Sequence, residues 1–142
     1  MIKIKLVLAL VLILVLQAGC TTVNNTFSKD VPEDIRRIFV GTWEGQYLDH
    51  EGIKVRTWIQ NRSADGTYTI DFVHYTEKGV SQTMRKGKWW LKGDRFYEIA
   101  LDVMEKPDVY EFEIISKNEI SFKSVAKIYT FIDKRIETAE MP

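Results

Sequence analysis

Apolar and polar residues alternate along most of this chain, and the period of the alternation predicts its elements. Ile35, Ile38 and Phe39 recur at helical spacing after Asp30, which is placed as an N-cap, and this pattern predicts one short helix that ends at Val40–Gly41. Beyond that point the period changes to two residues, which is typical of strands with one buried face. The buried face is predicted to carry Ile53, Val55, Thr57 and Ile59, then Tyr68, Ile70, Phe72 and His74, then Tyr97, Ile99, Leu101 and Val103, then Tyr110, Phe112 and Ile114, and finally Ile120 and Phe122.

Clusters of turn-forming residues separate these runs, at 64–66, 77–79, 92–94, 106–108 and 117–119. The pattern predicts an antiparallel meander of about eight short strands with no helix between them. Such strands either stack as two sheets or close on themselves, and closure removes both exposed edges. The sequence therefore favours an all-β fold, a small antiparallel up-and-down barrel of about eight strands preceded by a short helix.

The segment around Gly87 tests this interpretation, because strict alternation through Met84 and Trp90 aims Lys86 and Lys88 into the barrel. An unpaired ammonium group is costly there. A β-bulge at Gly87 avoids that cost. The bulged register is predicted to turn Met84, Trp89 and Leu91 inward and to turn Arg85, Lys88 and Trp90 outward. A three-residue loop at Gly93 then places Leu91 and Trp89 opposite Tyr97 and Ile99. The same register pairs Arg85 with Asp71 on the outer face. The alternative keeps Lys86 or Lys88 inside, as a site for a carboxylate or phosphate headgroup.

The first twenty residues follow another pattern. Lys3 and Lys5 precede the apolar run Leu6–Leu16, and small residues lead to Cys20. The apolar run has barely more than half of the about twenty residues that a spanning helix needs, so the three parts predict a secretory signal peptide and an exported chain. The segment resembles the lipobox of bacterial lipoproteins, although Gln17 stands where lipoboxes usually carry leucine. A soluble exported protein with a free thiol is the alternative.

The lipobox resemblance implies that Cys20, the only cysteine, is lipidated and becomes the mature N-terminus. It divides the chain into a signal peptide (1–19), a polar linker (20–31) and a barrel domain with its leading helix (32–142). Several acyl chains hold such a protein stably on a membrane. Because Thr21 is not aspartate, the resemblance implies the periplasmic face of the outer membrane, or the outside of the membrane in a single-membrane bacterium.

Charge limits the partners of the mature chain. Removal of residues 1–19 leaves 18 basic and 20 acidic residues, a formal charge of −2. This balance excludes a strongly basic surface and argues against nucleic acid as a partner. The membrane, a small ligand and another envelope protein remain as expected partners.

A second resemblance lies at the predicted switch from helix to strand. Gly41-Thr42-Trp43 resembles the Gly-x-Trp start of the calycins, the superfamily of lipocalins and fatty-acid-binding proteins. The resemblance implies that Trp43 closes one barrel end against a basic residue of the last strand, matched here by Arg135 or Lys134. It also implies an interior site for a small apolar or amphiphilic ligand, with the candidate residues Tyr68, Phe72, His74, Tyr97 and Phe112. The chain is shorter than a lipocalin and has too few strands for a fatty-acid-binding barrel.

Motifs for catalysis or metal binding do not occur: the sequence has no Gly-x-Ser-x-Gly, His-Glu-x-x-His, Walker loop or dinucleotide fingerprint. His74 is expected at the core or rim, and His50 in a polar turn. Glu111 and Glu113 share an outer face, with no buried environment to raise a pKa. We therefore expect no enzyme, no cofactor and no metal.

Two functions remain open. In the first, the barrel binds a small apolar or amphiphilic ligand in the cell envelope. In the second, a filled barrel acts as an interaction module, with Trp58 and Trp90 as outward-facing contact residues unless the helix covers one of them. The interior of the barrel distinguishes the two.

Overall fold

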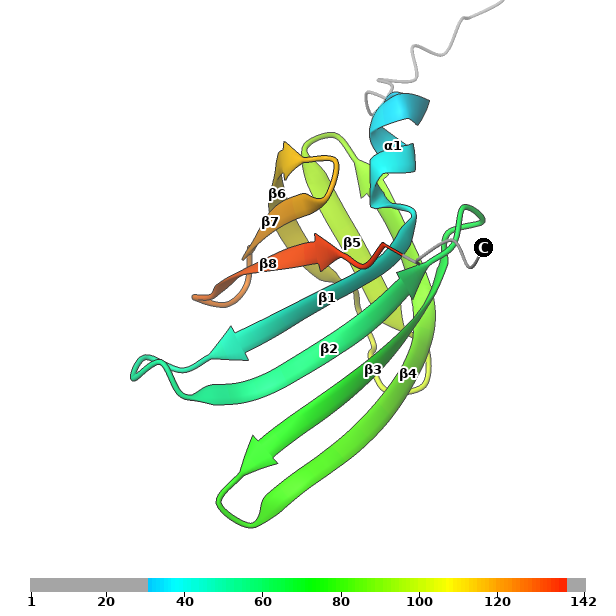
Figure 1. The fold of residues 1–142 in the computed structure, drawn as a ribbon. Coiled ribbons are helices and arrows are strands. Elements are labelled where there is room, and N and C mark those ends of the chain that lie inside the picture. Colours follow the sequence, from blue (N-terminus) through cyan, green and yellow to red (C-terminus); the bar gives the residue numbers. More distant parts are fainter. Residues whose placement is uncertain (1–30, 138–142) are drawn as a thin grey trace, which may run out of the picture.

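The computed structural model describes residues 31–137 and contains a closed antiparallel barrel (Figure 1). Each strand pairs with the next, and β8 returns to β1, so the predicted fold class is confirmed. Residues 1–30, with the predicted signal peptide, Cys20 and the proposed cap Asp30, lie outside the described residues. The elements are α1 (Glu33–Phe39), β1 (Gly41–Leu48), β2 (Lys54–Arg62), β3 (Thr67–Thr76), β4 (Gly79–Lys92), β5 (Arg95–Ala100), β6 (Asp108–Ser116), β7 (Glu119–Ser124) and β8 (Thr130–Arg135).

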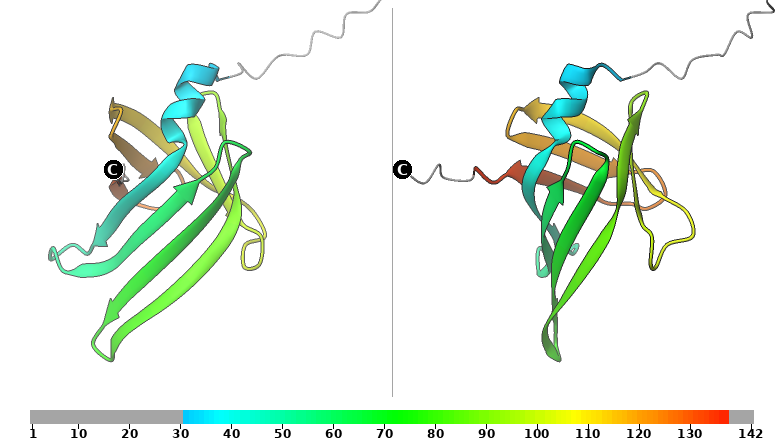
Figure 2. Two further views of the ribbon diagram at one scale, coloured as in Figure 1. Left: turned by 45° about the vertical axis from the view of Figure 1, so that its right-hand side comes forward. Right: turned by 90° about the vertical axis from the view of Figure 1, so that its right-hand side faces the viewer.

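The helix α1 lies over one end of the barrel, which we call the closed end (Figures 1 and 2). It begins after Pro32, whose fixed φ suits a helix start, and ends where Val40 becomes extended. Gly41 follows with φ +127°, a conformation that side-chain-bearing residues rarely adopt. A glycine is therefore required at the point where helix becomes strand.

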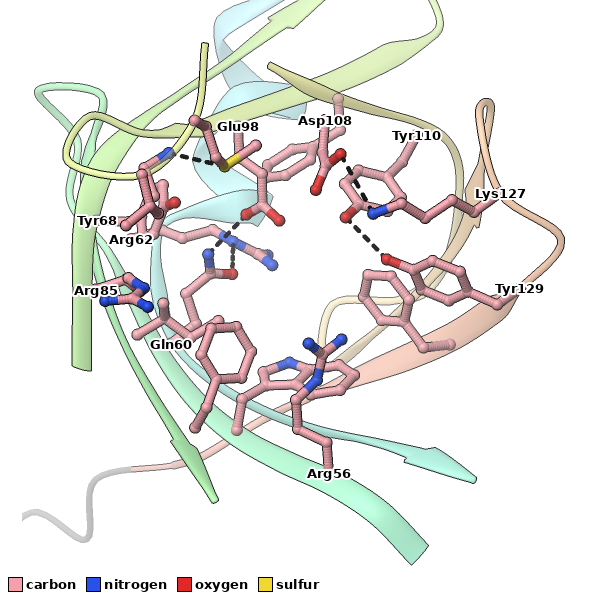
Figure 3. A pocket seen from close by; sticks show the side chains of 18 residues that line it. Arg56, Gln60, Arg62, Tyr68, Arg85, Glu98, Asp108, Tyr110, Lys127 and Tyr129 are labelled. Carbon is pink, nitrogen blue, oxygen red and sulfur yellow. Dashed lines mark hydrogen bonds and ion pairs between the residues drawn. The ribbon is translucent and has the colours of Figure 1, made fainter. Parts of the chain in front are cut away.

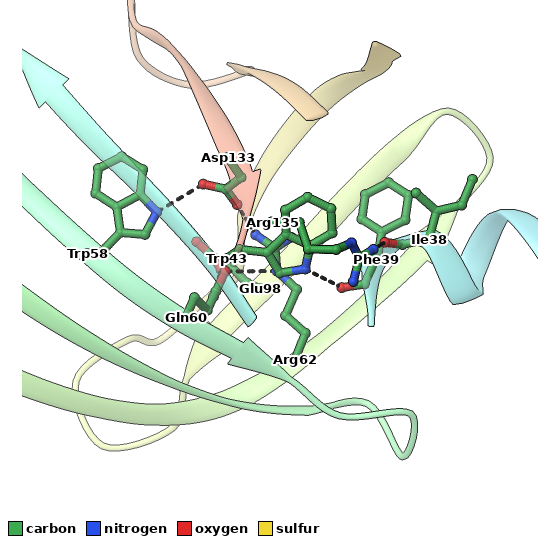
Figure 4. A network of polar contacts seen from close by, with 9 residues as sticks. All are labelled: Ile38, Phe39, Trp43, Trp58, Gln60, Arg62, Glu98, Asp133 and Arg135. Atoms are coloured by element: carbon green, nitrogen blue, oxygen red, sulfur yellow. Dashed lines mark hydrogen bonds and ion pairs between the residues drawn. The ribbon is translucent and has the colours of Figure 1, made fainter. Parts of the chain in front are cut away.

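Trp43 and Arg135 pack against each other at the closed end, as the calycin resemblance implies. Trp43 is fully buried, and its indole Nε1 donates to the carbonyl of Phe39 at 3.0 Å. The Arg135 guanidinium carbon lies 4.3 Å from the centroid of the Trp43 ring. Arg135 also donates to the carbonyls of Ile38 and Val40, at 2.6 and 2.8 Å, so the last strand holds the end of the helix (Figure 4).

Aromatic side chains fill the closed half of the barrel. Phe39 reaches in from the helix, with its ring centroid 5.8 Å from that of Phe96, 4.9 Å from that of Phe112 and 6.3 Å from that of Trp89. Phe122 packs on Phe96 at 5.1 Å. These are favourable aromatic distances, and no disulfide is needed to account for a stable core at this end.

The opposite end, which we call the open end, is built differently. β1 pairs with β8 only at Trp43–Arg135 and Glu44–Lys134, and β4 pairs with β5 only from Gly87 onward. The four strands β1–β4 therefore extend as a curved sheet beyond the other half of the molecule (Figures 1 and 2). This asymmetry leaves the interior accessible from the end away from α1.

The face of β2 differs from the prediction. Trp58, Gln60 and Arg62 are buried inside, whereas Ile53 and Ile59 are exposed. Acceptors inside the barrel explain the reversal, because Asp133 of β8 accepts from the indole of Trp58 and pairs with Arg62. The expected outward contact role of Trp58 is thus wrong.

The prediction of a bulge at Gly87 is also wrong. β3 and β4 pair without a register shift from Gly79 to Lys88, and both Lys86 and Lys88 point to solvent. An unbroken alternation with the opposite phase keeps the lysines outside, so neither the bulge nor an inward lysine is needed. It also exposes Met84 and turns Arg85 inward, where Arg85 lies opposite Ile70 and not Asp71.

The register between β4 and β5 also differs from the prediction. Lys92 lies opposite Arg95, which leaves a turn of Gly93 and Asp94 in place of the expected three-residue loop. Phe96 is therefore opposite Leu91, and Tyr97 points outward and stacks on Trp90 with ring centroids 5.3 Å apart. The outward position predicted for Trp90 is confirmed.

Candidate functional site

A cavity of about 200 Å³ lies inside the barrel, between the aromatic core and the open end (Figure 3). β2, β3, β4, β5, β6 and β8 line its sides, and the β5–β6 and β7–β8 connections contribute residues at the open end. The barrel is thus half filled and half hollow. Charged and polar side chains line the hollow half.

One wall of the cavity is apolar and aromatic. Trp58 of β2 packs edge-on against Phe131 of β8, with ring centroids 5.1 Å apart, and lies 6.3 Å from Phe72 of β3. Gly45 of β1 makes room for this indole, since a Cβ there would overlap the Trp58 ring. Ile70 continues the wall toward the closed end. This surface suits the apolar part of a ligand.

The inner end of the cavity is a buried polar network (Figure 4). Gln60 joins two charged residues, because its Nε2 donates to Glu98 at 2.9 Å and its Oε1 accepts from Arg62 Nε at 2.8 Å. Arg62 forms an ion pair with Asp133 and lies over the ring of Phe96 at 4.9 Å. Burial raises the pKa of Glu98, which favours its neutral form.

Tyrosine hydroxyls line the side formed by β6 and the β7–β8 connection. The hydroxyls of Tyr110 and Tyr129 are 3.1 Å apart and share a hydrogen bond (Figure 3). Burial raises the pKa of Tyr110, of Tyr129 and of Tyr68 across the cavity. All three therefore stay protonated. The bond between Tyr110 and Tyr129 uses one hydroxyl hydrogen, so Tyr68 and one of this pair can donate into the site.

Arg56 is the residue of the cavity whose charge is least balanced. Its guanidinium carbon lies 4.8 Å from the ring centroid of Phe72 and 5.7 Å from that of Trp58. Its Nε is buried without a hydrogen-bond partner. Within residues 31–137, no carboxylate lies at ion-pair distance from it. The guanidinium of Arg56 is therefore available to an anionic group.

The other cations that line the cavity have acidic partners. Arg62 pairs with Asp133, Arg85 with Asp102 at 3.6 Å, and Lys127 with Asp108 at 3.8 Å. Each of these three cations therefore has an acidic partner of its own, whereas Arg56 has none among the described residues. Arg62 adds an unsatisfied donor of its own, because its Nη1 is buried without a partner.

Of the five ligand-binding candidates named from the sequence, only two line the cavity. Tyr68 and Phe72 line the cavity. His74 lies beside Phe72, with ring centroids 5.8 Å apart, but is not part of the lining. Phe112 packs against Phe39 in the closed half, and Tyr97 is on the outer surface.

The residues that dominate the site were missed by sequence reasoning. Arg56, Gln60 and Arg62 alternate along β2 with more apolar neighbours, so hydrophobicity alone assigned them to the surface. Trp58 in the middle of this polar set was the available signal, since the largest side chain of a strand is usually buried. Glu98 was hidden in the same way between Tyr97 and Ile99.

Histidines and acids do not gather in this region. Among residues 31–137, no group of three or more histidine, cysteine, aspartate or glutamate side chains is arranged to hold a metal ion. His50 is exposed in the β1–β2 turn, with Nε2 3.7 Å from a carboxylate oxygen of Glu51. No helix in the described part of the chain has the length and apolar character to cross a membrane.

Comparisons with known proteins add little to this geometry. No family model matches the chain, and no curated protein matches it. Among solved structures, the chain is similar to a de novo designed fluorescence-activating β-barrel. That match has 18% sequence identity and a TM-score of 0.46, and it covers 72% of this chain and 98% of the designed one.

Proposed function

We propose that this protein is a lipid-anchored binding protein of the cell envelope, and that its cavity holds a small amphiphile with an anionic headgroup. The observation that carries the proposal is Arg56, a cation without an acidic partner beside an aromatic wall. Arg56 is half-buried, its Nε is buried without a hydrogen-bond partner, and an anionic ligand supplies that partner. The protein binds this ligand and does not convert it.

The remaining groups of the cavity suit the same ligand. A carboxylate or phosphate oxygen at Arg56 accepts from its guanidinium, and the apolar part lies against Trp58, Phe72 and Phe131. The hydrogen-bonded pair Tyr110–Tyr129 offers one hydroxyl donor on the opposite side. A cavity of about 200 Å³ holds the headgroup and a short apolar segment, and a longer chain extends through the open end.

Anchoring at Cys20 is compatible with access to this cavity. Residues 20–31 reach at most about 40 Å when extended, and they join the barrel at α1. The tether therefore joins the domain at the closed end, which is opposite the open end of the cavity (Figure 1). The lipobox resemblance supports this anchor and the periplasmic face of the outer membrane as its location.

The anchor has its own test. Cys20→Ser is expected to leave the precursor uncleaved by lipoprotein signal peptidase and to abolish labelling by a palmitate analogue in cells. The wild-type chain is expected to take up the label. A wild-type chain without label removes the anchor but leaves the binding site in place.

Binding is tested with the mature chain carrying Cys20→Ser, so that no detergent competes for the cavity. We expect a dansyl-labelled fatty acid to bind at one-to-one stoichiometry. Arg56→Met keeps the apolar stem and removes the charge, so it is expected to weaken binding about tenfold, which corresponds to about 1.4 kcal/mol. The uncharged methyl ester of the probe is expected to bind both forms equally.

A matched control is Arg85→Met, which removes a cavity cation that already has a partner in Asp102. It is expected to change the affinity less than Arg56→Met. Absence of binding across a panel of chain lengths and headgroups contradicts the proposal. It leaves the second candidate, a surface interaction module, which is favoured by the exposed stack of Trp90 on Tyr97.

A further inference from the structure

The extended half of β4 has a free edge, formed by Gly79–Lys86. On one side these residues pair with β3 over their whole length, from Gly79 opposite Thr76 to Lys86 opposite Thr69. On the other side, no described strand pairs with them, because β5 begins its pairing at Gly87 opposite Ala100. A row of unpaired backbone donors and acceptors of this kind is a template for another strand.

The turn geometry shows which backbone groups point to the free edge. Thr76 and Gly79 flank a two-residue turn, and the closing pair of such a hairpin is hydrogen-bonded. The N–H and C=O groups of alternate residues from Gly79 therefore point toward β3. Those of Val80, Gln82, Met84 and Lys86 point away from it. Lys92 opposite Arg95, at the other end of β4, gives the same alternation.

The usual protection against edge pairing is confined to one end of this edge, where Arg85 and Lys86 lie. Residues 79–84 contain no charge and no proline, and β4 has no bulge along its pairing with β3. Val80 and Met84 are 67% and 58% exposed on the outer face. The neighbouring Ser81 and Thr83, which alternate with them, are polar.

The order of these residues is self-complementary. An antiparallel two-fold centred on Gln82 places Val80 opposite the second copy's Met84, and Ser81 opposite the second copy's Thr83. Each exposed apolar side chain then covers the other, and the backbone groups that face the edge form about six hydrogen bonds. Arg85 falls opposite the second copy's Gly79. Lys86 comes next to the second copy's Lys78 in the β3–β4 turn, so like charges meet only at the two ends of the contact.

We propose that two copies of this protein pair edge to edge through β4, with Gln82 at the two-fold axis. This contact continues the sheet β1–β4 of one copy into that of the other. It is isologous, because the same surface is used by both copies, and it therefore closes as a dimer. The proposal does not depend on the ligand of the cavity.

Cysteine cross-linking tests the register in the full chain, expressed with its own N-terminus in cells. Opposed residues of a hydrogen-bonded pair have Cα atoms about 5.5 Å apart, which a disulfide spans. Under copper–phenanthroline oxidation, Gln82→Cys is expected to give a covalent dimer. Val80→Cys and Met84→Cys are each expected to give only background, whereas the double variant cross-links strongly.

Two further variants make the test decisive. Thr69→Cys is the matched control, exposed on β3 but flanked by strands on both sides, and it is expected to give only background. Val80→Lys places a charge on the edge and is expected to suppress the cross-link of Gln82→Cys. Equal cross-linking at residues 69 and 82, a cross-link that survives Val80→Lys, or an adduct with a different protein overturns the proposal.

Discussion

Arg62 and Asp133 form an ion pair inside the barrel, although 71 residues separate them in the chain. Both side chains are almost completely buried. The second carboxylate oxygen of Asp133 accepts from the indole of Trp58 at 2.9 Å, and Arg62 lies over the rings of Trp43, Phe96 and Phe122. One aspartate thus joins β8 to two residues of β2 across the barrel, and it neutralises a cation that has no access to water.

Removal of this aspartate is expected to be strongly destabilising. Asp133→Ala leaves the Arg62 guanidinium buried without a counter-charge and removes the acceptor of Trp58, so we expect a loss of about 3–5 kcal/mol in the free energy of unfolding. Urea denaturation followed by tryptophan fluorescence measures it. The control is Glu119→Gln, which breaks the exposed pair with Lys134 and should cost less than about 1 kcal/mol. Equal losses for the two variants would contradict a buried pair.

The fold was predictable because its signals are local. The two-residue period, the turn clusters and the helical spacing before Gly41 each depend on a few neighbouring residues, and they predicted the helix, the meander and the barrel. The partnership of Trp43 with Arg135 came from a family resemblance, and the structure bears it out.

The site was less predictable because its signals are not local. The phase of β2 depends on Asp133, which supplies partners for Arg62 and Trp58 from the far end of the chain. A prediction based on hydrophobicity alone places Ile59 inside and Arg62 outside. The prediction for β4 used a bulge to keep two lysines out of the barrel. An unbroken alternation of the opposite phase keeps them outside without a bulge.

Trp43 offers a test of the closed end. Trp43→Ala removes a fully buried indole and leaves a void beneath α1, so we expect a loss of about 3–5 kcal/mol, a large share of the stability of a small domain. The matched variant Trp90→Ala removes a side chain that is 36% exposed and stacks on one ring, and we expect a clearly smaller loss. A melting midpoint that Trp43→Ala leaves unchanged would remove the structural role of this end.

Glu98 makes the stability depend on pH in a defined direction. Burial raises the pKa of its carboxyl in the folded state above the ordinary value of 4.5, so the folded chain binds a proton that the unfolded chain has released. Its contribution to stability is full below pH 4.5 and is lost as the pH rises from there through the raised pKa. Glu98→Gln keeps the shape without a titrating group. We expect this variant to be more stable than the wild type at the upper end of that range, and a difference that is constant with pH would contradict the assignment.

Phe72 tests whether the cavity is the binding site. Its ring forms part of the aromatic wall beside Trp58 and Arg56, so Phe72→Trp fills space that the ligand needs. We expect this variant to lose binding of the dansyl-labelled fatty acid while its melting midpoint changes little. Ile59→Trp is the matched control, because Ile59 is half exposed on the outer face of β2, and an indole there leaves the cavity unchanged. Titration of both variants by fluorescence separates the outcomes. Binding that persists in Phe72→Trp places the ligand elsewhere, and binding lost equally in both variants points to a general disturbance of the sheet.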